Sequence, residues 1–169
     1  GLGDVYKRQK YVRETTEEVK TRREKERLEQ YFQTVVKNLP GGIAVVKFGE
    51  DGSMVPEFIS EGFAELTSMS LDETWDLYRT DALAGVHDED RERIHASLTE
   101  YIHSGDSQYE IVYRLKRGDG GYVWVKNTLS LIEAESGEKK FYAVYHDVSG
   151  EIAEKEQLRQ QYKDCLLYT

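Results

Sequence analysis

Cysteine and proline are almost missing from this sequence, which has one cysteine and two prolines among 169 residues. The lone cysteine, Cys165, excludes a disulfide within the chain and any zinc site built from several cysteines, and it favours a reducing, cytoplasmic setting. No apolar run approaches the roughly 20 residues of a membrane-spanning helix, and no signal-peptide pattern is present. We therefore expect no membrane span in this segment, although a larger parent protein could carry an anchor.

Basic side chains are outnumbered by acidic ones. The chain has 23 Lys and Arg against 32 Asp and Glu, a formal net charge of -9. Proteins that follow nucleic-acid phosphates need clustered basic side chains, and anionic membrane surfaces attract the same clusters. Neither nucleic acid nor a membrane surface is therefore an expected partner. The 38% of hydrophobic residues is typical of one globular domain with polar extensions.

The charge pattern divides the chain into segments. Residues 10–39 predict a charged N-terminal helical linker, either a solvated helix or a coiled coil between domains, and 40–149 predict the folded domain. A polar C-terminal helix is predicted over 150–164. The end segments 1–9 and 165–169 resemble translated adapter sequence, so we leave them out of the fold prediction.

Short strands and helices alternate within the folded domain. Asp51 and Gly52 predict the turn of a first hairpin, and Pro56 in its second strand favours an edge position. A helix is expected to begin near Asp88, where acidic side chains suit the positive end of its dipole, and to end at Gly105. Three strands with hairpin connections follow, which predicts an antiparallel sheet. The predicted strands cover 43–48, 54–60, 109–116, 122–132 and 141–148.

Five short motifs, in this order, resemble those of PAS domains. Their PAS counterparts are the entry into the first strand, the exit of the second, the start of the long helix, a hairpin and the exit into a signalling helix. The motifs lie at Asn38–Ile43, Ser60–Phe63, Val86–Arg91, Tyr113–Val125 and Asp147–Ser149. Asp88 stands where the family usually has proline, and a GAF domain is the nearest competing fold.

The resemblance implies an α+β fold: a five-stranded antiparallel sheet with short helices closing a cavity on one face, flanked by N- and C-terminal helices. It also implies a regulatory sensor or signal-relay module that is homodimeric and linked to an output domain. The motifs look most like those in PAS domains of bacterial diguanylate cyclases and histidine kinases. The alternative is a ligand-free dimerisation spacer. An enzyme is not expected, because the residues form no recognisable catalytic triad or dyad signature.

Asn127 marks the expected ligand cavity. It interrupts an apolar strand face that includes Val125 and Leu129, and a buried amide must find a hydrogen-bond partner. That partner is either a cavity ligand, the backbone, or the hydroxyl of Tyr109 or Tyr113.

Trp124 falls on the opposite face of the same strand, where so large an aromatic side chain must be covered. We expect the end of the N-terminal helix, near Phe32 and Val35, to cover it, together with or instead of a second subunit.

Asp147 and Ser149 occupy the exit into the signalling helix, and we expect Asp147 to cap that helix. In the family this aspartate also pairs with a nearby basic residue, which here would be Lys126 or Arg114. A simple N-cap without a regulatory role is the alternative.

No cofactor is expected. The four histidines lack the spacing of a zinc site, and residues 76–84 lack the cysteine that flavin photoreceptors of the family require. His95 is the weak haem candidate, because haem-binding relatives place their axial histidine on this helix. However, His95 follows the buried position Ile94 and is about 100° away from it around the helix, which favours a surface histidine.

Overall fold

The computed structural model describes residues 1–168 and divides the chain after Leu39 into two units. The first unit is one helix, α1 (Leu2–Asn38), which has no buried residue. It includes residues 2–9, which we had left out of the fold prediction. Pro40 ends it, because proline cannot continue a helix, and the N–H of Leu39 donates to the Val35 carbonyl at 3.0 Å in the last turn.

The second unit is built on a five-stranded antiparallel sheet in the order β2-β1-β5-β4-β3. Pro56 lies in the edge strand β2, as predicted, beside an irregularity in the pairing of β1 with β2. The strands are β1 (Gly42–Phe48), β2 (Met54–Ile59), β3 (Gln108–Lys116), β4 (Tyr122–Glu133) and β5 (Lys139–Asp147).

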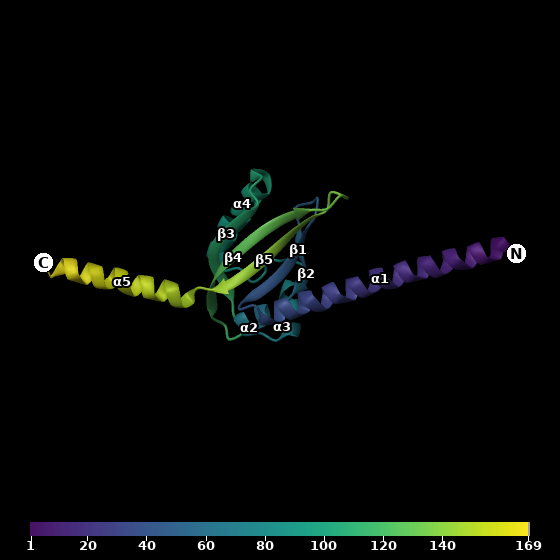
Figure 1. Ribbon diagram of the computed structural model, residues 1–169. Coiled ribbons are helices and arrows are strands. Elements are labelled where there is room, and N and C mark those ends of the chain that lie inside the picture. The colour runs from purple at the N-terminus through teal and green to yellow at the C-terminus, as the bar shows by residue number, and fades with distance from the viewer. Residues whose placement is uncertain (169) are drawn as a thin grey trace. The chain divides into compact units, whose positions relative to one another are not determined.

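Helices connect the strands and continue the chain beyond them. Ser70 and Glu73 form a capping box at the start of α3, and Gly105 ends α4 with a positive φ of 75°, a conformation that glycine adopts without steric cost. The helices are α2 (Glu61–Leu66), α3 (Leu71–Tyr78), α4 (Asp88–Ser104) and α5 (Ser149–Leu167). Helices α2, α3 and α4 lie on the sheet side that forms the core (Figure 1).

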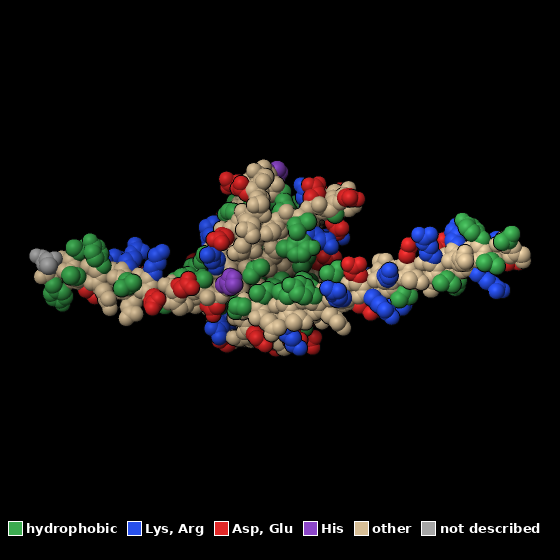
Figure 2. All heavy atoms as spheres, in the orientation of Figure 1, with side chains coloured by type: hydrophobic (Ala, Val, Ile, Leu, Met, Phe, Trp, Pro, Cys, Tyr) green, Lys and Arg blue, Asp and Glu red, His purple; other side chains and the backbone are tan. Residues whose placement is uncertain are grey.

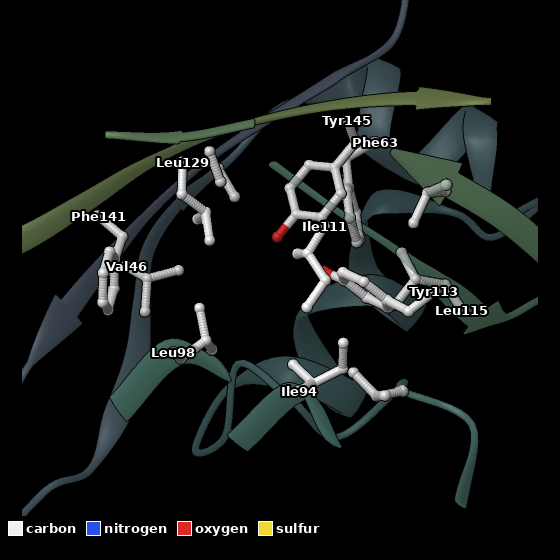
Figure 3. Packing of buried hydrophobic residues seen from close by; sticks show 14 of the residues in the cluster. Val46, Phe63, Ile94, Leu98, Ile111, Tyr113, Leu115, Leu129, Phe141 and Tyr145 are labelled. Carbon is white, nitrogen blue, oxygen red and sulfur yellow. The ribbon is translucent and has the colours of Figure 1, made fainter. Parts of the chain in front are cut away.

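The hydrophobic core lies between the sheet and α4. Strand residues that alternate toward this side are buried, and α4 contributes a stripe of Ile94, Leu98 and Tyr101. Figure 3 shows Ile94 and Leu98 facing Leu129 and Phe141 across this space. The predicted α+β fold and antiparallel sheet are therefore confirmed.

Within residues 1–168, none of the helices is both long enough and apolar enough to cross a membrane.

Candidate functional site: the core cavity and the exit into the last helix

A small cavity lies in the core beneath the sheet. Its volume is about 20 Å³, which is enough for one water molecule. The residues that line it are mostly apolar and come from the sheet, from α4 and from the segment before α4. They are Val46, Met54, Ala82, Leu83, Ile94, Leu98, Ile111, Tyr113, Asn127, Leu129, Phe141 and Tyr145.

Asn127 supplies the carboxamide of this cavity, and its side chain is 4% exposed. Its Nδ2 donates to the Tyr113 hydroxyl at 2.9 Å. Its Oδ1 has no hydrogen-bond partner among residues 1–168. The Asn127 NH2 group thus binds the Tyr113 hydroxyl, which was one of the predicted alternatives. The Asn127 carbonyl oxygen can still accept a hydrogen bond.

The other predicted cavity residues separate into two groups. Tyr113 and Leu129 line the cavity together with Asn127. Val125 is fully buried on the same strand but is not part of the lining, and Tyr109 instead stacks on Tyr101 with ring centroids 5.3 Å apart. The predicted set therefore overlaps the cavity in three of its five members.

Two buried tyrosines were missed from the sequence: Tyr145, which lines the cavity, and Tyr78, which lies elsewhere in the core. Burial raises the pKa of the Tyr145 hydroxyl to about 12, and burial also raises the pKa of Tyr113 and of Tyr78. Figure 3 shows the Tyr145 hydroxyl pointing into the space between the sheet and α4. Its alternation with Phe141 and Ala143 along β5 was a signal that could have placed it inside.

The exit from the sheet into α5 is built around Trp124. The last β4–β5 pair joins Val125 to Asp147, so the backbone of Trp124 lies beyond the end of β5. The first residues of the exit take over its hydrogen bonds: Ser149 Oγ accepts from the Trp124 N–H at 3.0 Å, and the Val148 N–H donates to the Trp124 carbonyl at 2.9 Å. The start of α5 therefore continues the hydrogen bonding of the sheet.

Asp147 has a smaller part in this exit than the resemblance implied. Its exposed carboxylate accepts the N–H of Ser149 at 2.9 Å, which satisfies one backbone donor at the start of the helix.

The expected partners of Asp147 are bound to other carboxylates, so that pairing is wrong. Arg114 binds Asp90, with Nε 3.0 Å from Oδ2, and Lys126 lies 3.4 Å from Glu110. Among residues 1–168, the structure contains no ion pair between Asp147 and either of these cations.

Trp124 is partly covered on its ring face. The Arg114 guanidinium lies 5.1 Å from the centroid of the Trp124 ring, a distance at which a cation is attracted to an aromatic face. Phe32 and Val35 belong to α1, in the other unit, so their packing against Trp124 stays a prediction.

His95 lies on α4 with its side chain exposed, next to the fully buried Ile94. Among residues 1–168, the structure contains no cluster of three or more His, Cys, Asp or Glu side chains that could hold a metal ion. His87 has a defined local role, because its Nδ1 accepts from the Glu89 N–H at 3.1 Å and caps α4.

Comparison with known proteins agrees with this geometry. A family model described as the PAS fold matches residues 56–146, more than half of the chain. A search of curated proteins found no match.

Solved structures with the same fold cover most of the chain. A sensory box histidine kinase/response regulator from Burkholderia thailandensis is 18% identical, with a TM-score of 0.58 over 79% of this chain and 96% of that one. The N-terminal domain of a diguanylate cyclase with PAS/PAC sensor from Marinobacter aquaeolei is 21% identical, with a TM-score of 0.51 over 64% and 97%. The PAS domain of an HTR-like protein from Haloarcula marismortui is 22% identical, with a TM-score of 0.55 over 75% and 98%.

Proposed function

We propose a function from one premise: this chain belongs to the PAS fold family, whose members are regulatory sensor domains of signalling proteins. In the proposal, the domain relays a signal from its core to α5 and from α5 to an output domain further along the parent protein. The output would be a histidine kinase or a diguanylate cyclase, the two kinds of protein named for the similar structures from Burkholderia and Marinobacter.

One observation carries this proposal: α5 begins without a loop and is bonded to the sheet. Val148 and Ser149 complete the backbone hydrogen bonds of Trp124. A change in the twist or position of β4 therefore moves the first turn of α5 with it. A helix transmits such a movement along its length because its backbone hydrogen bonds keep it stiff.

The far part of α5 supports a dimer. Leu158, Tyr162 and Leu166 follow one another at intervals of four residues and are 65%, 67% and 58% exposed. Side chains at this spacing lie close to one face of a helix, and Figure 2 shows hydrophobic groups near the C-terminal end of α5. In the proposal, two copies of α5 bury these side chains against each other.

Insertions into α5 of the full-length protein test the relay. Two residues inserted after Gln160 turn the rest of the helix by about 200°, whereas seven residues return it to within about 20° of its original phase. The two-residue insertion should change output activity at least about tenfold, and the seven-residue insertion should restore it. Equal output from both insertions would rule out the relay through α5.

Sedimentation of the present chain tests the dimer. Aspartate at both Leu158 and Tyr162 should shift the chain toward monomer, because charges would then face each other in the helix contact. Gln160→Asp is the control, since it adds a charge to the same helix outside that stripe. A wild-type chain that is monomeric at all concentrations contradicts the dimer.

The size of the cavity favours a relay without a large resident ligand, haem or flavin. A space of about 20 Å³ holds one water, whereas drug-sized ligands occupy pockets of about 300 Å³ or more. Asn127 Oδ1 would still accept a hydrogen bond from a small ligand. Native mass spectrometry of the purified protein separates the two cases, because a stoichiometric bound metabolite or chromophore would overturn the ligand-free version.

A further inference from the structure

Arg114 is held on the open edge of the sheet by α4. Strand β3 forms one of the two edges of the sheet, and the two backbone groups of Arg114 that point away from β4 are both bonded to the N-terminal part of α4. Its N–H donates to Asp90 Oδ2 at 3.0 Å, and its carbonyl accepts the N–H of His87 at 3.0 Å.

The side chain of Arg114 also binds α4, through the carboxylate of Asp90. Its Nε lies 3.0 Å from Asp90 Oδ2 and its Nη2 lies 3.0 Å from Asp90 Oδ1. The Asp90 side chain is 8% exposed and that of Arg114 is 23% exposed. A two-point pair of this kind fixes direction as well as distance, so the guanidinium must follow any movement of Asp90.

The same guanidinium covers Trp124, which pairs directly with Arg114 across β3 and β4. Its central carbon is 5.1 Å from the centre of the indole ring. The backbone of Trp124 in turn binds Val148 and Ser149 at the start of α5. Arg114 and Trp124 therefore bridge α4 and α5 across two strands.

The other end of this bridge reaches the core. Ile94 and Leu98 follow Asp90 on α4 by about one and two helical turns, and both line the cavity. A change in the contents or packing of the cavity that shifts α4 shifts Asp90 with it, because all three residues stand on one continuous helix.

From these contacts we infer that Asp90, Arg114 and Trp124 are positioning residues that couple the place of α4 to the start of α5. The coupling rests on the proposed relay function, for which it supplies a route from the core to the exit helix. This route depends on the salt bridge at the sheet edge and does not use the carboxylate of Asp147.

Amide hydrogen exchange in the present chain tests the coupling directly. Arg114→Met keeps the length and apolar stem of the side chain but removes the charge, and Asp90→Asn removes the carboxylate charge. Each should raise the exchange rates of the Trp124 and Val148 amides by about three- to tenfold. Lys126→Met is the control, because it removes an exposed ion pair, Lys126–Glu110, from the face of β4 that carries Trp124, and it should leave both rates within about twofold. Unchanged rates in both test variants would overturn the inference.

A double-mutant comparison separates coupling from general loosening of the fold. Ser149→Ala removes the side-chain acceptor through which Trp124 holds α5. If the route runs through this contact, Asp90→Asn should add less than about twofold to the Val148 exchange rate once Ser149 is Ala. Independent effects that multiply in full would contradict the route.

Output measurements distinguish failure of the route from failure of the relay. In the full-length protein, Arg114→Met should change output activity by at least about threefold, and Lys126→Met should not. If the α5 insertions change output while Arg114→Met does not, the route is wrong and the relay stands. If the insertions have no effect, the relay is wrong, and the exchange rates still decide whether α4 and α5 are coupled.

Discussion

Replacing Tyr78 with phenylalanine is expected to stabilise the domain, whereas the same replacement at Tyr101 is expected to destabilise it. Both side chains are 2% exposed, and both rings pack on another aromatic ring, with centroids 5.4 Å from Phe63 and 5.3 Å from Tyr109 respectively. The two substitutions therefore remove the same atom from equally buried places. They differ in what the hydroxyl binds.

The hydroxyl of Tyr78 has no hydrogen-bond partner among residues 1–168. Burying an unpaired hydroxyl costs about 1–3 kcal/mol, so Tyr78→Phe should raise the free energy of unfolding by about 1 kcal/mol. The hydroxyl of Tyr101 accepts the N–H of Leu131 at 3.0 Å and lies 3.2 Å from the Ser107 carbonyl, to which it donates. Tyr101→Phe loses both bonds and should lower the free energy of unfolding by about 2 kcal/mol.

Urea denaturation of the wild type and both variants measures this difference. The expected gap of about 3 kcal/mol is roughly a hundredfold in the unfolding equilibrium constant, and the slopes of the three curves should agree, because the same surface is exposed on unfolding. The reasoning fails if Tyr78→Phe is destabilised by 1 kcal/mol or more, since the Tyr78 hydroxyl would then have a bound partner in solution.

Three further changes test other parts of the core and its edge. Gly85→Ala should destabilise the domain by about 1–3 kcal/mol in urea denaturation, because the new Cβ would overlap the Tyr78 hydroxyl, and Tyr78→Phe should restore part of the loss. Hydrogen bonding from Arg114 lowers the pKa of Asp90 in the folded state; the stabilisation it gives is complete above the unfolded pKa of about 3.9 and is lost as pH falls through the folded value, so Asp90→Asn should flatten the acid limb of a stability–pH curve. Burial raises the pKa of Tyr145 to about 12 in the folded state. The contribution of the protonated hydroxyl to folding stability is therefore complete below the unfolded pKa of about 10 and is lost as pH rises from there toward 12. Tyr145→Phe should reduce the loss of stability measured over that range.

The order of the elements could be predicted because each is encoded locally. Asp51 and Gly52 form the turn between β1 and β2, and Ser70 with Glu73 forms the capping box of α3. The inward position of Asn127 followed from the period of two along β4. Such signals need only neighbouring residues, so one sequence is enough to show them.

The partners across the sheet edge could not be predicted in the same way. In the sequence, Asp90 is one of three acidic residues in the first turn of α4, where any of them would favour the helix dipole, and it belongs to the Val86–Arg91 motif. Neither feature identifies a partner for it. Its separation from Arg114 by 24 residues carries no local signal. The pair exists because Val86 bridges to Leu115 and sets the start of α4 against β3, which is a property of the assembled fold.

Asp147 is the residue that the sequence motif singles out at the start of α5, but it does not provide the main hydrogen bonds that attach this helix to the sheet. Asp147 is exposed, so water can replace its hydrogen bond to Ser149 at little net cost. Trp124 holds Val148 and Ser149 through its own backbone, and no substitution at position 124 except proline removes a backbone donor. The attachment of α5 therefore depends on the position of β4. The side chains able to change that position are those that contact β4 from neighbouring elements. Arg114 is such a side chain, since it contacts the Trp124 ring and is itself bound by Asp90.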